Sequence, residues 1–300
     1  MPSLWWSLPA RALLAALGLL VAALPRPLEL RLGRAFGRAV LRLGLFKHRT
    51  VAANIALALP ELSEPGRRAL LEENYAHYGV LFFEFLHFFC PLPGHYARYA
   101  RRVSRLENVE LWERARQKGK GVIFFSSHLG FWEMSAAAAG LAGLKPTIVT
   151  TVLKPRWLHD QITACRASTG VKAAFHPGSM PTVLRALRRG ESVAFMNDQY
   201  APPPMGVPVV FFGQSVATLS VVGPLAKRTG APVLPVYSVR GPDGVTTVRI
   251  EPELALGPAG GDAAQATQLV AARVERWVRE FPDQWLWLHR RFKNASSAPR

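Results

Sequence analysis

The stretch from Gly121 to Met134 carries the clearest candidates for chemistry. His128 follows the apolar run Val122–Phe125 and two serines, and Glu133 follows His128 by five positions. A histidine whose one ring nitrogen is held by a carboxylate keeps its other nitrogen free to accept a proton. Such a pair is a base of the kind that activates a hydroxyl for acyl transfer.

Two predicted elements would position this pair. Val122–Phe125 is rich in β-branched and aromatic residues and is bounded by glycine, which predicts a buried strand. An alanine-rich helix is predicted from about Phe131 to Leu141, so His128 lies where a strand passes into a helix, the usual ligand position in open α/β sheets. On a regular helix His128 and Glu133 would lie about 140° apart, so Glu133 reaches the imidazole only if His128 precedes the first turn. The spacing alone fits a capping histidine and a solvated glutamate equally well.

The rest of the chain alternates between helical and strand patterns, which predicts an α/β protein. Further helices are predicted at 28–46, 64–89, 107–118, 156–168, 178–190, 217–229 and 263–281, and further strands at 146–152, 191–197, 233–239 and 245–251. Within the second of these helices, Glu84 and His87 are three residues apart and are predicted to pair. We expect three segments: N-terminal membrane-anchoring or amphipathic helices at 1–46, the main α/β domain at 47–293, and a disordered tail at 294–300.

The composition favours an anionic partner, because 37 basic and 20 acidic residues give a net charge of +17. Arginines interleaved with apolar residues suit a membrane surface better than nucleic acid, and no nucleic-acid-binding motif is present. Two cysteines exclude a disulfide scaffold and a cysteine-based zinc site. The eight histidines are scattered, and neither a phosphate-binding glycine loop nor a His-Glu-x-x-His motif occurs, so we expect neither metal nor cofactor.

The N-terminal segment is apolar but short for a membrane span. Leu13–Leu24 is uninterrupted, whereas a full span needs roughly 20 residues, and Arg11 breaks the longer stretch. Trp5, Trp6 and Arg11 are typical of interfacial anchors, which favours a short tilted span or a helix lying in the interface over a cleaved signal peptide.

The helix predicted at 28–46 is amphipathic. Arg31, Arg34, Arg38 and Arg42 recur at helical spacing between apolar residues. We expect this basic face to contact anionic headgroups; an ordinary solvated face is the alternative.

Residues 126–133, Ser-Ser-His-Leu-Gly-Phe-Trp-Glu, resemble the His-x4-Asp/Glu block of the lysophospholipid acyltransferase superfamily. The glutamate form, with Gly-Phe-Trp inside it, is similar to the late acyltransferases of lipid A biosynthesis, the lauroyl and myristoyl transferases. Other segments resemble this family in the same order along the chain: 48–63, 166–172, 198–218 and 282–293.

The resemblance implies a mixed central sheet flanked by helices, like that of glycerol-3-phosphate acyltransferases. It implies an enzyme that moves a fatty acyl chain from acyl-acyl carrier protein to a hydroxyl of a Kdo-lipid IVA-type lipid A precursor, for lipopolysaccharide, at the cytoplasmic face of the inner membrane. His128 would be the base and Glu133 would orient it. Arg166 would meet acceptor phosphate or the oxyanion, and Asp198 and Gln199 would shape the acceptor site.

Three alternatives remain at this point. The acceptor could be another anionic lipid, such as a lysophospholipid, a mannoside or an ornithine lipid. The protein could bind lipid at a membrane surface without catalysis, or it could hydrolyse acyl esters on the same scaffold.

Overall fold

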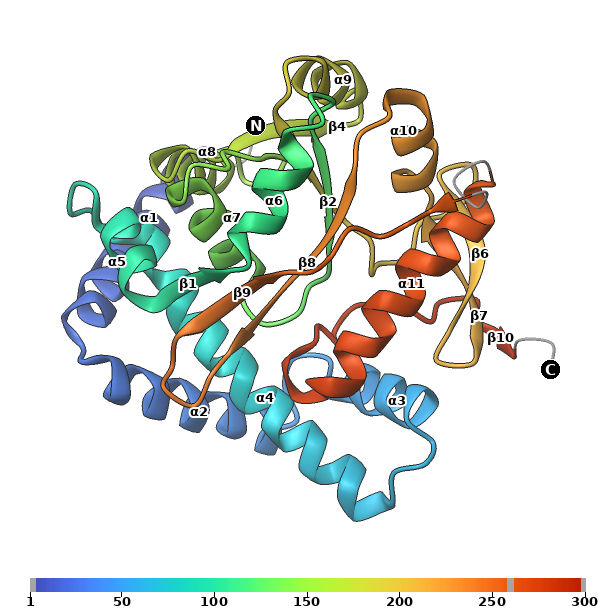
Figure 1. Cartoon of the computed structure of the whole chain (residues 1–300). Coiled ribbons are helices and arrows are strands. Elements are labelled where there is room, and N and C mark those ends of the chain that lie inside the picture. The colour runs from blue at the N-terminus through green and yellow to red at the C-terminus, as the bar shows by residue number, and fades with distance from the viewer. Residues whose placement is uncertain (1–3, 258–261, 298–300) are drawn as a thin grey trace.

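The computed structural model describes residues 4–257 and 262–297, and side chains from residue 8 to residue 295 outside that gap. A seven-stranded sheet of order β1-β9-β8-β2-β5-β3-β4 organises the chain (Figure 1). Neighbouring strands are parallel except β8 and β9, so the predicted mixed α/β sheet is confirmed. Its strands are β1 (Ser104–Glu107), β2 (Val122–Ser126), β3 (Thr147–Thr151), β4 (Lys172–His176), β5 (Ser192–Met196), β8 (Val233–Arg240) and β9 (Thr246–Ile250).

Helices cover both faces of this sheet and form an apolar core on each face. The residues of β2 alternate between these two cores. Ile123 and Phe125 pack into one core with α9, α10 and α11, whereas Val122 and Phe124 pack into the other beside α6. A strand buried on both faces reads as a continuous apolar run, as β2 does. The helices of this part are α6 (Val109–Arg116), α7 (Trp132–Leu141), α8 (Arg156–Ser168), α9 (Met180–Arg188), α10 (Val222–Thr229) and α11 (Ala263–Glu280).

A second sheet of order β10-β7-β6 lies beside the first, formed by β6 (Gly206–Phe211), β7 (Gln214–Leu219) and β10 (Ser296–Ser297). The helix predicted to begin at residue 217 is therefore wrong at its start, because Ala217 and Thr218 belong to β7 and the helix begins at Val222. The hairpin closes at Phe212 and Gly213, which both have positive φ, as a two-residue type I′ turn requires. The predicted tail at 294–300 contributes β10, and residues 298–300 lie outside the described residues.

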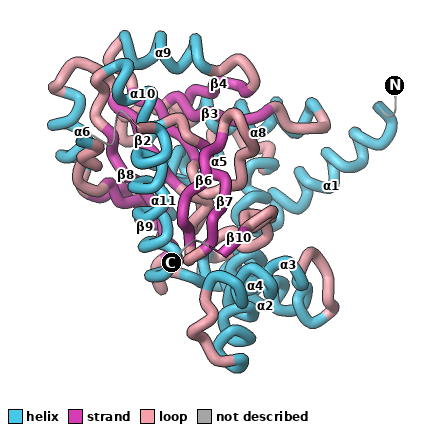
Figure 2. Tube along the Cα trace, turned by 90° about the vertical axis from the view of Figure 1, so that its right-hand side faces the viewer, coloured by secondary structure: helices cyan, strands magenta, loops and turns pink. Residues whose placement is uncertain are grey.

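Three of the N-terminal helices, α2, α3 and α4, lie below the sheets in Figure 2, whereas α1 extends to one side and α5 packs against α7 and α8. Gly33 and Gly37 of α2 pack against Gly79 of α4, where any Cβ atom would overlap the backbone of the facing helix. The close crossing fixes which face of α2 points outward. The elements are α1 (Leu4–Ala23), α2 (Arg26–Arg42), α3 (His48–Ala58), α4 (Glu64–Leu86), the 3₁₀ turn η1 (His87–Phe89) and α5 (His95–Val103).

The expected membrane segment is helical, but none of the helices within the described residues is long and apolar enough to cross a bilayer. The side chains of Trp5 and Trp6, predicted as interfacial anchors, lie outside the part of the chain whose side chains are described.

The predicted basic face of α2 is partly used inside the molecule. Arg34 and Arg38 both pair with Glu73 of α4, at 2.5 and 2.7 Å. Arg31 and Arg42 remain exposed on the outer side of the helix. Only half of the arginine stripe is therefore placed to meet an external partner.

Candidate active site

His128 lies in the loop between β2 and α7, and Asp198 holds it at two points. The main-chain N–H of His128 donates to Asp198 Oδ2 at 2.7 Å, and its ring Nδ1 lies 2.8 Å from Asp198 Oδ1. Asp198 follows β5, which pairs in parallel with β2, so the carboxyl ends of the two strands bring these residues together. With Nδ1 donating to a carboxylate, Nε2 is left as the nitrogen that can accept a proton.

Asp198 is buried yet remains the charged partner of this pair. Burial alone would raise the pKa of Asp198, but the charge of His128 and three hydrogen bonds outweigh it and hold that pKa below its usual value. The third bond comes from Trp285, whose indole Nε1–H donates to Asp198 Oδ2 at 2.8 Å.

The expectation that Glu133 reaches the imidazole is wrong for this geometry. Glu133 lies in the first turn of α7 and faces α8, where Arg166 donates to both of its oxygens, at 2.9 and 2.6 Å. His128 does precede the helix, as required, but the loop carries its ring toward β5 instead. Burial by itself would lower the pKa of Arg166, and the partnership with Glu133 outweighs it and raises that pKa, so the pair is a fixed ion pair.

A cavity of about 490 Å³ opens beside His128, within the range of small-molecule sites. Trp132, Ser135, Ala136 and Ala139 of α7 line it, at the i, i+3, i+4 and i+7 spacing of one helix face. Their mostly small side chains leave space between α7 and the sheet. The other apolar lining residues include Phe85, Leu106, Phe124, Leu144, Ile148, Leu153, Ile162, Val236 and Ile250.

Gln199 covers the ring of His128. Its Nε2 lies 3.3 Å from His128 Nε2 and 3.4 Å from Nδ1, so the amide sits over the ring face and beside the free nitrogen. Arg291 is buried and donates to the main-chain oxygens of Gln199 and Ala217, at 3.3 and 3.0 Å. These two hydrogen bonds connect Gln199 to the β6–β7 hairpin. Burial lowers the pKa of Arg291 to about 10, and the nearby charge of Asp198 partly opposes this shift.

The structure gathers all five residues singled out in the sequence. His128, Glu133, Arg166 and Gln199 line the cavity, and Asp198 lies directly behind His128. Sequence reasoning did not assign Trp285 or Arg291 to this site, although both stand in the segment 282–293 that carries the family resemblance. Within the described residues, no group of three or more His, Cys, Asp or Glu side chains could hold a metal ion.

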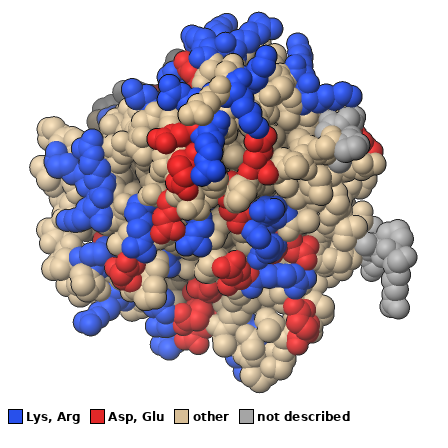
Figure 3. All heavy atoms as spheres, in the orientation of Figure 1, with Lys and Arg blue, Asp and Glu red and all other residues tan. Residues whose placement is uncertain are grey.

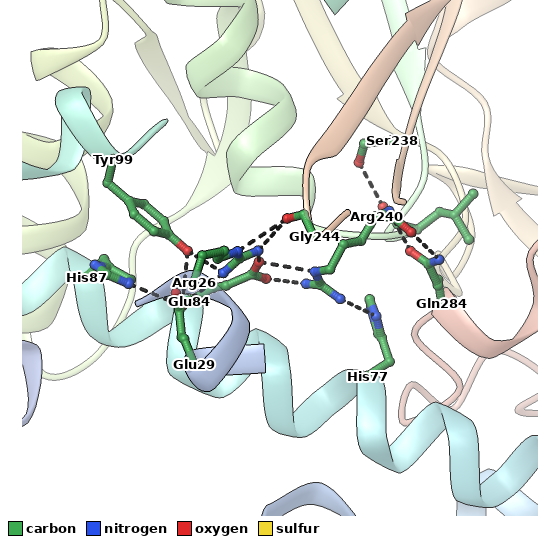
Figure 4. Close-up of polar contacts among 11 residues, drawn as sticks. Arg26, Glu29, His77, Glu84, His87, Tyr99, Ser238, Arg240, Gly244 and Gln284 are labelled. Atoms are coloured by element: carbon green, nitrogen blue, oxygen red, sulfur yellow. Dashed lines mark hydrogen bonds and ion pairs between the residues drawn. The ribbon is translucent and has the colours of Figure 1, made fainter. Parts of the chain in front are cut away.

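A network of buried charges around Glu84 connects α2, α4 and β8 (Figure 4). Glu84 of α4 accepts hydrogen bonds from Arg26 of α2 and from Arg240 at the end of β8. The main chain of Arg240 is bound by the side-chain amide of Gln284, at 2.8 and 3.0 Å. The carbonyl of Gln284 accepts the N–H of Gly130 at 3.0 Å, so the network reaches the loop two residues after His128.

The predicted pairing of Glu84 with His87 is wrong, because the two side chains bond to different partners. His87 instead lies 3.2 Å from Glu29 and 2.8 Å from the ring of His95. The arginines that bind Glu84 come from distant elements, α2 and β8, which the helical spacing of Glu84 and His87 could not reveal.

Comparisons with known proteins identify the family of this chain. The family model for bacterial lipid A biosynthesis acyltransferase matches residues 6–294. The lipid A biosynthesis lauroyltransferase of Escherichia coli K12 is 28% identical over 91% of this chain and 88% of its own length. The palmitoleoyltransferase of the same organism is 27% identical, covering 90% and 86%. A phosphatidylinositol mannoside acyltransferase of Mycobacterium tuberculosis is 29% identical over 63% of this chain and 65% of its own. The chain therefore belongs to the bacterial lipid A biosynthesis acyltransferase family, whose members are enzymes that transfer acyl groups.

Proposed function

We propose that this protein transfers a fatty acyl chain from acyl-acyl carrier protein to a hydroxyl group of a Kdo-lipid IVA-type lipid A precursor. The observation that carries the proposal is a histidine, held by a buried aspartate, at the side of an apolar cavity. That arrangement offers a proton acceptor where an acyl chain can be bound away from water.

The chemistry needs only groups that the chain provides. The acceptor hydroxyl gives its proton to His128 Nε2 while its oxygen attacks the thioester carbonyl. Asp198 stabilises the imidazolium that forms. When the tetrahedral intermediate collapses, the C–S bond breaks and the leaving thiolate takes the proton from the imidazolium. The products are the acylated lipid and the free thiol of the carrier, and no acyl-enzyme is required.

The cavity is proposed to hold the acyl chain of the donor. Its wall is apolar apart from a few polar groups, among them Ser126, Ser135 and the Glu133–Arg166 pair. A charged arginine in that wall could stabilise the thioester oxyanion, and Gln199 lies close enough to His128 to do the same. The roles of Glu133 and Arg166 remain predictions. Because the two side chains form an ion pair, we propose that they act together, whereas the sequence resemblance implied that Glu133 orients the base and Arg166 meets the substrate.

The charges suit both proposed substrates. The carrier protein and the phosphorylated glycolipid are anionic, and this chain has a net charge of +17. Figure 3 shows Lys and Arg gathered over α9, where Arg185, Arg188 and Arg189 are exposed, while the middle of that face mixes both signs. A mannoside acceptor is the second candidate, favoured by the similarity to the phosphatidylinositol mannoside acyltransferase.

The direct test is a transfer assay with purified protein. With acyl-acyl carrier protein and Kdo-lipid IVA, we expect a product that mass spectrometry identifies as the precursor with one added acyl chain. Phosphatidylinositol mannoside and acyl-coenzyme A serve as the competing acceptor and donor. Free fatty acid formed at the same rate without any acceptor would instead identify a hydrolase. An absence of both products would support the non-catalytic alternative.

We further propose that the N-terminal helices dock on the cytoplasmic face of the inner membrane. Large apolar side chains are exposed along the outer face of α2 and in the following loop, where Leu43, Leu45 and Phe46 are 71%, 52% and 65% exposed. Exposed apolar surface of this kind marks interaction sites. Arg31 and Arg42 flank it, which favours an anionic bilayer as the occupant. The other exposed large apolar side chains of these N-terminal helices are Leu28, Leu32 and Phe36 on α2, Leu8, Leu13, Leu19 and Leu20 on α1, and Phe82 on α4.

A triple variant in which Leu43, Leu45 and Phe46 are each replaced by serine is expected to bind phosphatidylglycerol-containing vesicles about 10- to 100-fold more weakly, because three partly inserted side chains are lost. Vesicle flotation measures this binding. The matched control replaces Val210 of β6 and Leu269 of α11, which are also exposed apolar residues, and should bind like wild type. The proposed surface would be contradicted if the triple-serine variant and the control variant bound equally well. It would also be contradicted if the wild-type protein bound neutral phosphatidylcholine vesicles as strongly as phosphatidylglycerol-containing ones.

A further inference from the structure

Two neighbouring tryptophans close to the proposed active site are almost equally buried but bond to different partners. Trp285 and Trp287 are 1% and 0% exposed, and their rings meet edge to face at 4.6 Å. The indole N–H of Trp287 donates to the carbonyl of Pro282 at 2.7 Å. The indole N–H of Trp285 donates to the carboxylate of Asp198 at 2.8 Å. Packing explains both rings, but it does not explain why one of them ends on the partner of His128.

The main chain of the segment around Trp285 is bound to the loop that carries His128. Leu286 N–H donates to the carbonyl of His128, and Gly130 N–H donates to the carbonyl of Gln284, both at 3.0 Å. Trp285 and Leu129 thus form an antiparallel bridge. The backbone of Trp285 therefore pairs with the β2–α7 loop, while its ring binds Asp198 just after β5.

The Asp198 carboxylate has little freedom to turn while this ring is in place. Its Oδ2 accepts from the main-chain N–H of His128 and from Trp285, and its Oδ1 accepts the imidazole N–H. A donor on Oδ2 also spreads the negative charge of the carboxylate, which moderates how strongly that charge holds a proton on the imidazole.

We propose that Trp285 is a positioning residue for acyl transfer, which orients Asp198 and thereby sets how readily His128 is protonated. The inference rests on the proposed role of His128 as the base. Replacing the indole N–H should leave a more strongly negative Asp198 beside the ring, so the imidazole should hold its proton to higher pH.

Other charged groups lie near Asp198 and His128, and these groups are still present when Trp285 is replaced. They are His289 and Arg291 from the C-terminal segment, Lys47 before α3, and the Glu133–Arg166 pair in the cavity wall. The charges of Asp198, His128, Arg291 and Lys47 all act on His289. A shift seen only after loss of the Trp285 N–H is therefore assigned to the Asp198 contact.

The experiment compares Trp285→Phe with the matched control Trp287→Phe in the full-length protein. In Trp285→Phe the midpoint of the acid limb of kcat/KM against pH should rise by about 0.5 to 1 pH unit, since a hydrogen bond to a charged group is lost. The midpoint in Trp287→Phe should stay at the wild-type pH. NMR titration of the His128 ring without substrate should show the same shift.

A second variant separates the N–H from the space that the ring fills. Benzothienylalanine at position 285 keeps a bicyclic ring of nearly the same shape and lacks the N–H, so it should reproduce the shift with less effect on folding. An unchanged midpoint in this variant and in Trp285→Phe would overturn the inference and leave Trp285 with packing alone. Full activity of a His128→Ala variant would instead overturn the role of the base, while the NMR titration would still test the Trp285 contact.

Discussion

Replacing Asp198 with asparagine is expected to lower kcat/KM for acyl transfer by about 10³- to 10⁴-fold, close to the loss expected on replacing His128 with alanine. Asp198 accepts the Nδ1–H of His128 and so leaves Nε2 free. An asparagine amide can donate to Nδ1 instead, which places the ring hydrogen on Nε2, where a base is needed. Steady-state transfer rates with the carrier-bound donor measure the loss.

The pH profile of the residual activity distinguishes Asp198 from Glu133 as the carboxylate that acts on the base. Asp198→Asn removes a negative charge beside the imidazole, so the midpoint of the acid limb should fall. In Glu133→Gln the lost charge was already paired with Arg166, and the midpoint should hardly move. The reverse pattern, with a shift only in Glu133→Gln, would restore the dyad that the sequence spacing suggested.

Much of the fold could be predicted because its strands and helices are strongly patterned. The strand predicted at 122–125 and the helix predicted at 156–168 correspond to β2 and α8. The missed strands β1, β4 and β6 lie at sheet edges, where burial gives a weaker pattern in the sequence. Strand β7 is the middle strand of the smaller sheet and was missed because its second half falls within the helix predicted from residue 217. Strand β1, for example, has only four residues and none of them is buried.

The candidate residues were found from the sequence, but their partners could not be. His128 and Glu133 are close in sequence, whereas the side chains that bind them come from elsewhere: Asp198 from the loop after β5 and Arg166 from α8. Local spacing says which residues lie near a strand end. It does not say which way a loop turns, and here that turn decides which carboxylate meets the imidazole.

The buried network behind the loop leads to the largest expected effect on stability. Replacing Glu84 with glutamine is expected to lower the free energy of unfolding by about 3 to 5 kcal/mol, because the largely buried Arg240 loses its counter-charge and Arg26 keeps only its pairing with Glu29. The Glu84 side chain is fully buried, and it receives Arg26 from α2 and Arg240 from β8. Urea unfolding followed by circular dichroism measures the change.

Glu73 provides a matched control on the same helix. It also binds two arginines, Arg34 and Arg38, at 2.5 and 2.7 Å, but its side chain is 42% exposed. Water and salt screen that pair, so Glu73→Gln should cost at most about 1 kcal/mol of unfolding free energy. Equal losses in the two variants would mean that burial does not set the cost of breaking these ion pairs. A small loss at Glu84 would mean that the arginines find water when it is replaced, and that the network does not hold the His128 loop in place.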